Sequence, residues 1–303
     1  MGETLGKTPL PGPGEAWDPI RLTRWSGEYL EEKGVENGRL DAEFLLAQVL
    51  GVGRLDLYLQ FDRPLRTSEL ESFKTLLRRR ASREPLQYIL GKAAFRELDL
   101  RTDARALIPR PETEVLVQGV LDCVGHQGVS LSALDVGTGS GAIALSLLKE
   151  GPFERVVATD LCPEALGLAE ENARDQGLLE RVEFRMGPGF EPVQSGERFD
   201  VIVSNPTYIP EGDKTSLQPE VRDWEPKGAL FAGLSGLDVV LPLSAQAPEF
   251  LGEGGLFATE VGDGQAGEVA RAMQDTGAYS EVEVRMDLAG KARVVLGVAS
   301  INK

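Results

Sequence analysis

The feature that most constrains the fold is an alternation of strand-like and helix-like segments that begins near residue 131. The strand-like runs lie at 131–136, 155–160, 182–186, 199–204 and 256–261. The helical runs lie at 142–149, 163–175, 237–250 and 265–276. Such alternation produces βαβ units, so we predict an α/β fold with a mostly parallel sheet covered on both faces. Glu281–Arg285 and Arg293–Ala299 follow each other without a helix, which predicts an antiparallel pair at the end of the sheet.

The first third of the chain has a different pattern. Proline and glycine recur near the N-terminus, so we predict a flexible tail over 1–16 and a small helical domain over 17–92. Asp41–Leu50 has helical spacing, and Gly51 follows it in the position of a C-cap. A capping box formed by Ser68 and Glu71 precedes a further helix.

Charge limits the partners of the protein. The formal net charge of the 303 residues is −16, and all the excess acid lies after residue 92. Such a surface repels a phosphate backbone, so we expect no direct nucleic-acid contact. Basic residues gather only near the end of the predicted helix after Ser68, and they are Arg78, Arg79, Arg80 and Arg83. They indicate either a docking patch for an acidic partner or a solvated face that complements the helix dipole.

Cysteine and histidine are scarce. Cys123, Cys162 and the single histidine, His126, have none of the spacings of a zinc site and cannot form a disulfide framework. We therefore expect no metal, a half-buried Cys123 thiol and a surface His126 imidazole. No apolar run approaches the ~18 residues of a membrane helix, and no signal-peptide core is present. We expect a cytoplasmic, monomeric protein that does not enter a membrane.

A glycine-rich loop follows the first strand of the alternating region, and it reads Asp135-Val136-Gly137-Thr138-Gly139-Ser140-Gly141. Its glycines let the backbone turn sharply and approach a ligand, and the next helix offers free N–H groups. Asp160, at the end of the second strand, is placed either to bind ribose hydroxyls or to cap the helix that begins at Pro163. Both NAD and S-adenosylmethionine contain adenosine, so these residues indicate an adenosine ligand and leave its chemistry open.

Two further features favour S-adenosylmethionine. The carboxylate of Asp135 suits the cationic amino-acid end of that cofactor and would serve a pyrophosphate poorly. The fourth strand ends directly in Asn205-Pro206-Thr207-Tyr208. The side-chain oxygen of Asn205 and the carbonyl of Pro206 are acceptors suited to an –NH2 group, while Tyr208 offers a flat face for a planar amide or base. The alternative is a structural Asn-Pro turn with a packed tyrosine.

At these residues the chain resembles the class I methyltransferases that act on planar nitrogen. More specifically, it resembles the HemK/PrmC family of release-factor glutamine methyltransferases. The resemblance covers nearly the whole chain from about residue 17, and its most specific motif is Ile-Pro-Arg-Pro-Glu-Thr-Glu. The segments that carry it are Glu84–Gly91, Leu107–Glu114, and Val221-Arg222, Glu225-Pro226, Ala229-Leu230 and Gly233 in the long loop after Asn205.

The resemblance implies a helical domain over 17–92 that docks a release factor, a β-hairpin linker over 93–107, and a catalytic domain over 108–303. The catalytic domain is expected to be Rossmann-like, with a mostly parallel seven-stranded sheet. The implied reaction transfers a methyl group from S-adenosylmethionine to the glutamine side-chain nitrogen in the Gly-Gly-Gln motif of peptide-chain release factors. The expected cofactor-binding residues are Asp135, Gly137, Thr138, Gly139, Ser140, Gly141, Asp160, Gly189, Phe190 and Asn205. The expected catalytic residues are Asn205, Pro206 and Tyr208, which bind the glutamine together with Thr207.

Two positions depart from the family pattern. Thr207 replaces the usual second proline of Asn-Pro-Pro-Tyr, and Gly187-Pro188-Gly189-Phe190 replaces an acidic residue followed by a bulky one after the third strand. The second change removes a carboxylate partner of adenine, so we expect lower cofactor affinity, with Phe190 stacked on or beside the ring. Three alternatives remain: an amino methyltransferase for adenine or another nucleic-acid base, an NAD-dependent oxidoreductase, and an adaptor without catalytic activity.

We predict that Thr207→Pro raises kcat/KM by roughly two- to fivefold, because proline reduces the entropy lost when the site loop becomes ordered. The measurement compares both enzymes on one release factor at saturating cofactor. A lower rate in the proline variant would show that the threonine hydroxyl supplies a needed hydrogen bond.

Overall fold

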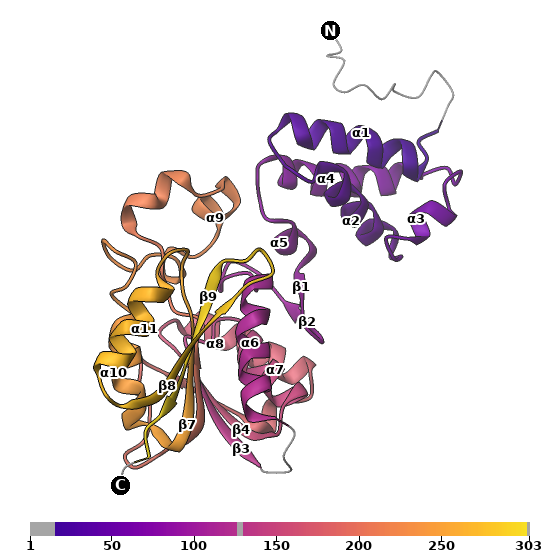
Figure 1. Cartoon of the computed structure of the whole chain (residues 1–303). Helices are drawn as coiled ribbons and strands as arrows, with labels where there is room; N and C mark the ends of the chain where they lie inside the picture. Colours follow the sequence, from indigo (N-terminus) through magenta and orange to yellow (C-terminus); the bar gives the residue numbers. More distant parts are fainter. Residues whose placement is uncertain (1–15, 126–129, 302–303) are drawn as a thin grey trace. The chain divides into compact units, whose positions relative to one another are not determined.

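The computed structural model describes residues 16–125 and 130–301. The predicted tail, apart from Ala16, and His126 lie outside the described residues. The chain divides into two compact units (Figure 1). The helical unit comprises the described residues up to Gly91 together with Pro219–Trp224. The sheet unit comprises the described residues of Lys92–Gln218 and Glu225–Lys303, and it includes the hairpin segment that we expected as a linker.

The helical unit is built from short and medium-length helices around an apolar core. Its helices are α1 (Pro19–Glu32), α2 (Gly38–Leu50), α3 (Asp56–Leu59), α4 (Thr67–Ala81), α5 (Leu86–Leu90) and α9 (Pro219–Trp224). Leu30, Leu45 and Phe73 are among the side chains buried in its core. In α4 the apolar residues Phe73 and Leu77 recur at helical spacing, and this face is buried. Helix α2 buries Ala42, Leu45 and Leu46, whereas its Leu40 and Phe44 are exposed.

The ends of two helices test the predicted caps. Helix α2 ends at Gly51, whose φ of +65° is the left-handed conformation of a C-cap, so that prediction is confirmed. The predicted capping box is wrong by two residues. Helix α4 begins at Thr67, and the backbone N–H of Arg66 donates to the carboxylate of Glu69 at 2.8 Å.

Two arginines near the end of α4, Arg80 and Arg83, are engaged within the helical unit. Arg80 is only 7% exposed, and its guanidinium donates to Asp41 at 2.7 Å, to Glu220 at 2.9 Å and to the backbone carbonyl of Glu84. Arg83 donates to both carboxylate oxygens of Glu220. Arg80 is therefore neither a docking patch nor a solvated face; it pairs with the buried Asp41 and the partly buried Glu220.

Seven strands form the main sheet of the sheet unit. They are β3 (Leu131–Val136), β4 (Phe153–Asp160), β5 (Val182–Met186), β6 (Phe199–Ser204), β7 (Leu251–Glu260), β8 (Tyr279–Met286) and β9 (Ala292–Ala299). Their order is β5-β4-β3-β6-β7-β9-β8. The first five strands in this order are parallel, and β9 pairs antiparallel with both β7 and β8. This confirms the predicted parallel sheet and its antiparallel end. A separate antiparallel hairpin joins β1 (Lys92–Phe95) to β2 (Leu98–Arg101).

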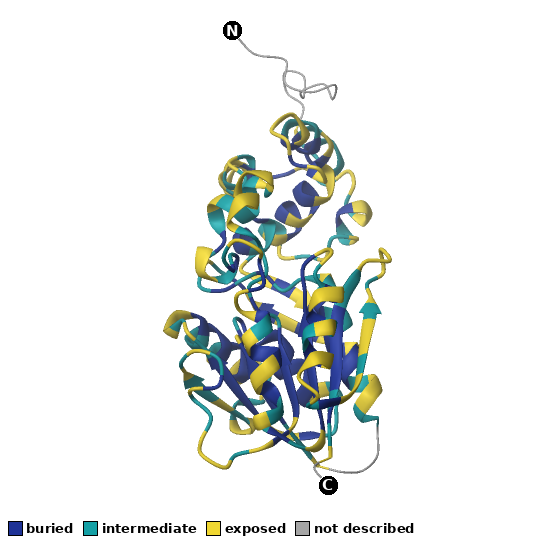
Figure 2. Ribbon diagram, turned by 60° about the vertical axis from the view of Figure 1, so that its left-hand side comes forward, coloured by how far each residue is buried: buried dark blue, intermediate teal, exposed yellow. Residues whose placement is uncertain are grey.

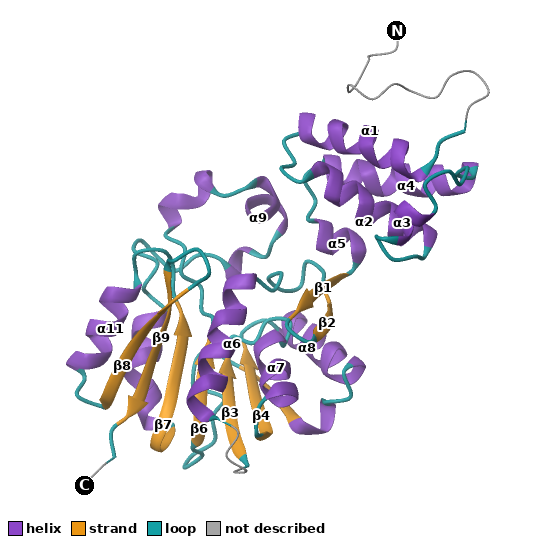
Figure 3. Ribbon diagram, turned by 45° about the vertical axis from the view of Figure 1, so that its right-hand side comes forward, coloured by secondary structure: helices purple, strands orange, loops and turns teal. Residues whose placement is uncertain are grey.

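Helices cover both faces of the main sheet, and the buried strands lie between them (Figure 2). One face packs against α6 (Pro111–Val124), α7 (Ala142–Glu150) and α8 (Pro163–Asp175) (Figure 3). The other packs against α10 (Val240–Gln246), labelled in Figure 1, and α11 (Ala266–Asp275). Side chains alternate between the faces. Val201 faces the first set of helices, whereas Ile202 faces the second. The predicted helix over 237–250 is shorter, because α10 gives way to a short 3-10 turn at Ala247–Glu249.

The strand order reverses between β3 and β6, which makes this the topological switch point of the sheet. Strand β3 pairs with β4 on one side and with β6 on the other. Val136 and Ser204 lie opposite each other at the carboxyl ends of β3 and β6, and the Ser204 hydroxyl donates to the Val136 carbonyl at 2.7 Å. Ligands of open α/β sheets bind at such a switch point, so we expect the functional site in the loops that follow β3 and β6.

We predict that Arg80→Ala lowers the free energy of unfolding of the helical unit by about 3–5 kcal/mol, because Asp41 and Glu220 lose their buried partner. The matched control is Arg79→Ala, which removes a more exposed ion pair with Glu84 and should change the free energy by at most about 1 kcal/mol. Urea unfolding followed by tryptophan fluorescence reports on this unit, because it contains the three tryptophans of the chain, Trp17, Trp25 and Trp224. Equal effects of the two changes would contradict a buried role for Arg80.

Candidate functional site

The glycine loop turns through left-handed backbone conformations. The φ angles are +77° at Gly137, +56° at Gly139 and +84° at Gly141, a region that favours glycine. A Cβ added at Gly137 would meet no described atom within 4 Å, and one at Gly139 would meet only the Ala106 methyl at 4.0 Å. At Gly141, by contrast, an added Cβ would lie 3.3 Å from the Cβ of Ala169 in α8. The first two glycines therefore border open space that a ligand can approach, and the third allows close helix packing.

Asp135 lies fully buried beneath this loop. One carboxylate oxygen, Oδ2, accepts hydrogen bonds from the Thr138 hydroxyl at 2.7 Å and from the Ala144 N–H at 3.1 Å. The other, Oδ1, has no hydrogen-bond partner among the described residues. Burial raises the pKa of Asp135 to about 7. A buried carboxylate with an unused acceptor suits a ligand ammonium group, which would supply both a donor and the missing positive charge.

Asp160 connects the glycine loop to the end of β4. Its carboxylate accepts hydrogen bonds from the N–H of Gly139 at 2.8 Å and from the N–H of Cys162 at 2.9 Å. Helix α8 has Cys162 at its N-cap and no side-chain cap, so Asp160 holds the turn before the helix and is not the capping residue itself. Each carboxylate oxygen can accept more than one hydrogen bond, which leaves acceptor capacity for ribose hydroxyls.

The turn after β5 meets Asp160 through the backbone. The N–H of Gly187 donates to the Asp160 carbonyl at 3.0 Å, and Gly189 has a φ of +49°. Phe190 is only 6% exposed, and its ring stacks on Phe250 with centroids 4.5 Å apart. Phe250 thus covers one face of the Phe190 ring, and the side chain packs in the core. The expected place of Phe190 on or beside adenine stays a prediction.

The Asn-Pro-Thr-Tyr segment is anchored to two residues that our reading of the sequence did not identify. The Asn205 side-chain Nδ2 donates to the Thr113 hydroxyl at 3.0 Å, and that hydroxyl donates to Glu260 Oε2 at 2.7 Å. The Tyr208 hydroxyl donates to Glu260 Oε1 at 3.2 Å. Thr113 lies in the Ile-Pro-Arg-Pro-Glu-Thr-Glu motif at the start of α6, and Glu260 ends β7. An acidic residue at the carboxyl end of a buried parallel strand was the available signal for Glu260.

Further contacts hold the backbone of this segment. The Tyr208 carbonyl accepts from Gln265 Nε2 at 2.9 Å. Gly236 has a φ of +77°, and a Cβ there would lie 2.2 Å from the same carbonyl, so only glycine fits. Arg110 pairs with the buried carboxylate of Glu225 in the long loop. These contacts fix the loop that presents Asn205 and Pro206.

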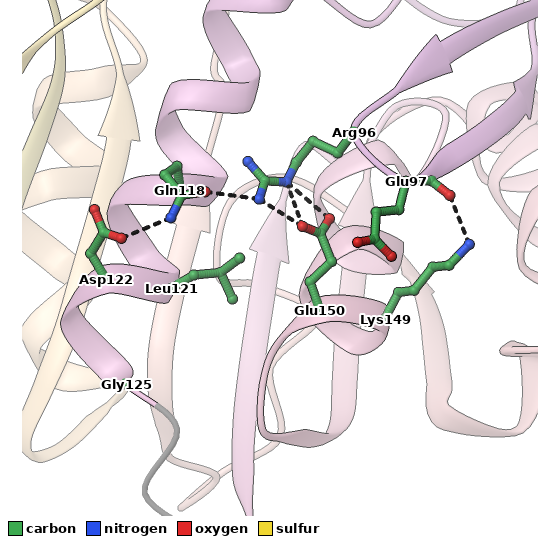
Figure 4. A pocket seen from close by; sticks show the side chains of 8 residues that line it. All are labelled: Arg96, Glu97, Gln118, Leu121, Asp122, Gly125, Lys149 and Glu150. Carbon is green, nitrogen blue, oxygen red and sulfur yellow. Dashed lines mark hydrogen bonds and ion pairs between the residues drawn. The ribbon is translucent and has the colours of Figure 1, made fainter.

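A pocket of about 570 Å³ lies elsewhere in the sheet unit (Figure 4). It is lined by Arg96, Glu97, Gln118, Leu121, Asp122, Gly125, Lys149 and Glu150. Arg96 donates to Glu150 at 2.6 Å and to Gln118 at 3.0 Å, and Lys149 donates to the Glu97 carbonyl. It lies at the ends of α6 and α7 that are opposite to the glycine loop. Arg96, Gln118, Asp122 and Glu150 already bind one another, and the pocket is remote from the switch point, so we do not take it as the candidate site.

Two features are absent from residues 16–125 and 130–301. No group of three or more histidine, cysteine, aspartate or glutamate side chains is arranged to hold a metal ion. No helix in these ranges has the length and apolar character needed to cross a membrane. The Cys123 side chain, expected to be half-buried, is exposed.

The fold and the loops at its switch point define the class of protein. Residues 133–227 match the methyltransferase domain family. A methyltransferase from Pyrococcus furiosus superposes with a TM-score of 0.51 at 20% identity, over 69% of this chain and 92% of that one. The 16S rRNA N2 G1207 methyltransferase of T. thermophilus superposes with a TM-score of 0.51 at 18% identity, over 69% of this chain and 49% of that one. The sheet unit therefore has the Rossmann-like fold of class I methyltransferases.

The particular family follows from closer relatives. Residues 21–91 match the PrmC N-terminal domain family. The release factor glutamine methyltransferase of Geobacter sulfurreducens is 44% identical over 93% of this chain and 97% of its own length. Those of Vibrio cholerae and Chlorobaculum tepidum are 41% and 38% identical, over 89% and 90% of this chain and 93% and 94% of their own. This chain belongs to the family of release factor glutamine methyltransferases.

We predict that Asp135→Asn changes stability and cofactor affinity in opposite directions. Because burial raises the pKa of Asp135 to about 7, the native state binds more protons than the unfolded state between about pH 4 and 7. Stability therefore falls as pH rises through that window, and it stays lower above it. Asparagine removes the buried charge, so the melting temperature of the variant without ligand should be higher than that of the parent at pH 8. Below about pH 4, where Asp135 of the parent is protonated, the two melting temperatures should be similar.

The same change should weaken S-adenosylmethionine binding by roughly 10- to 100-fold, because a charge-assisted hydrogen bond to the ammonium group is lost. Thermal unfolding at several pH values and calorimetric titration measure the two effects. A lower melting temperature at pH 8, or unchanged affinity, would contradict the assignment.

Proposed function

We propose that this protein methylates the side-chain amide nitrogen of the glutamine in the Gly-Gly-Gln motif of peptide-chain release factors, with S-adenosylmethionine as methyl donor. The observation that carries the proposal is the orientation of Asn205. Its Nδ2 is engaged by Thr113, which leaves Oδ1 as an acceptor at the carboxyl end of β6, beside the glycine loop. The names of the relatives support this substrate. Because release factors work in translation, we propose the cytoplasm as the site of action.

The loop after β3 and its neighbours fit the cofactor. The unused Oδ1 of Asp135 suits the ammonium group, and the open space beside Gly137 and Gly139 admits a ligand close to the backbone. Asp160 would accept from the ribose hydroxyls. When bound, S-adenosylmethionine supplies an electrophilic methyl group on a positively charged sulfur. The residues of this chain then have to bind and orient the glutamine.

An amide nitrogen is a weak nucleophile because its lone pair is delocalised into the carbonyl. Asn205 Oδ1 and the Pro206 carbonyl can together accept both N–H bonds of the substrate amide. Held this way, the nitrogen favours a pyramidal geometry in which the lone pair is no longer delocalised. The contribution of the protein is then positioning and electrostatic stabilisation by groups that are already in place.

Tyr208 contributes its ring and not a proton-accepting oxygen. Its hydroxyl donates to Glu260, and burial together with the nearby Glu260 carboxyl raises the pKa of Tyr208 well above its usual value. The phenol therefore stays protonated at neutral pH and cannot serve as a general base. Its flat face is suited to pack against the planar amide of the substrate.

The direct test incubates the purified protein with a release factor and methyl-labelled S-adenosylmethionine, followed by mass spectrometry of the Gly-Gly-Gln peptide. We expect one methyl group on the glutamine. Label in adenine-containing RNA or DNA instead would favour a base methyltransferase. Cofactor binding without transfer to either substrate would favour the adaptor.

We predict that Asn205→Ala lowers kcat/KM for the release factor by roughly 10²–10³, because it removes an acceptor that is in place before the reaction. Cofactor affinity should change by no more than a few fold, as measured by calorimetry. Activity of the variant close to that of the parent would reject the role of Asn205.

A further inference from the structure

A buried chain of hydrogen bonds leads from the end of β7 to the amide of Asn205. Glu260 is 1% exposed and Thr113 is 4% exposed. The Thr113 hydroxyl lies 2.7 Å from Glu260 Oε2 and 3.0 Å from Asn205 Nδ2. The three residues come from α6, β7 and the loop after β6, so packing of the sheet unit brings them together.

Donor and acceptor chemistry fixes the direction in which these hydrogen bonds run, from Asn205 through Thr113 to Glu260. An ionised carboxylate accepts hydrogen bonds and donates none, so Thr113 must donate its single hydroxyl proton to Glu260. The Thr113 oxygen can then only accept from Asn205. If the Asn205 amide were rotated by 180°, its Oδ1 would face the Thr113 oxygen with no proton between them. The buried carboxylate thus disfavours the rotated amide.

We propose that Thr113 and Glu260 are positioning residues that keep Asn205 Oδ1, and not Nδ2, facing the substrate nitrogen. The inference rests on the proposed function, in which Asn205 accepts an N–H from the substrate amide. A rotated Asn205 would present a donor to a donor and would repel that amide. The specificity of the site for an –NH2 group is therefore maintained by residues that do not touch the substrate.

Tyr208 ties the same carboxylate to the other part of the glutamine site. Glu260 accepts from the Tyr208 hydroxyl through Oε1 and from Thr113 through Oε2. One buried group therefore orients both the acceptor and the aromatic face. A single change at Glu260 should disturb both, whereas a change at Thr113 should disturb only Asn205.

The protonation state of Glu260 also affects the orientation of Asn205. Burial raises the pKa of Glu260 to about 7, against the lowering effect of the hydrogen bonds from Thr113 and Tyr208. The charged groups that act on it are Glu112 at the start of α6, which raises the pKa, and Arg293 on β9, which lowers it. Once protonated, Glu260 can donate a hydrogen bond to Thr113, so the direction of the hydrogen bonds between Glu260, Thr113 and Asn205 is no longer fixed. The active form is therefore the carboxylate.

The test compares Thr113→Val, which keeps the branched shape without the hydroxyl, with Thr113→Ser, which keeps the hydroxyl. We expect Thr113→Val to lower kcat for the release factor roughly 10- to 100-fold while KM and cofactor affinity change by no more than a few fold. Thr113→Ser should recover activity to within a few fold of the parent. Equal activity of both variants and the parent would overturn the proposal, as would equal losses in both variants.

Two readouts distinguish this proposal from the proposed function. At saturating cofactor, kcat of the parent should rise through a pH near 7, and Glu260→Gln should abolish that step. The 15N-labelled side chain of Asn205, assigned by its absence in Asn205→Ala, should show a hydrogen-bonded amide proton in the parent and in Thr113→Ser but not in Thr113→Val. A pH step that persists in Glu260→Gln, or an amide signal unchanged in Thr113→Val, would overturn the proposal. Failure of the parent to methylate would reject the proposed function, and the amide signal alone would then decide the orientation.

Discussion

The parallel pairing of β3 with β6 is the interaction on which the site depends. It sets Val136 opposite Ser204, so that the glycine loop and Asn205 leave the sheet at neighbouring points of the same edge. Alternate side chains of both strands are buried against helices on opposite faces. A shift of register by one residue would exchange the side chains that pack against the two sets of helices and would move Asn205 relative to the glycine loop, so this register is strongly specified. The glycine loop and the loop that begins at Asn205 are thereby placed side by side.

The candidate site contains two buried carboxylates with similar surroundings. In each case a buried carboxylate at or next to the last residue of a strand accepts a hydrogen bond from a threonine hydroxyl. Asp135 in β3 accepts from Thr138 in the following loop, and Glu260 in β7 accepts from Thr113 at the start of α6. Burial raises the pKa of both carboxyls to about 7. The two differ in what they leave unused. Asp135 keeps a free acceptor among the described residues, which suits a cation, whereas both oxygens of Glu260 accept from side chains.

The parts of this arrangement that are local in sequence could be predicted. The β-rich runs and the helical runs between them predicted the sheet, and the positions of Asp135 and Asn205 followed from the strand ends. Thr113 and Glu260 could not be linked in advance, because they are 147 positions apart and meet only in the folded sheet unit. Arg80 was misjudged because charge was equated with exposure. The stacking of Phe190 on Phe250 could not be predicted either, because the two residues are far apart in the sequence.

The central claim is that the oriented Asn205 and the Pro206 carbonyl receive both N–H bonds of a substrate amide. A crystal structure of the protein with S-adenosylhomocysteine and a glutamine-containing Gly-Gly-Gln peptide tests it most directly. We predict that the glutamine Nε2 lies within about 2.7–3.2 Å of both Asn205 Oδ1 and the Pro206 carbonyl oxygen. A glutamine nitrogen bound away from these two acceptors, or facing Asn205 Nδ2, would contradict it.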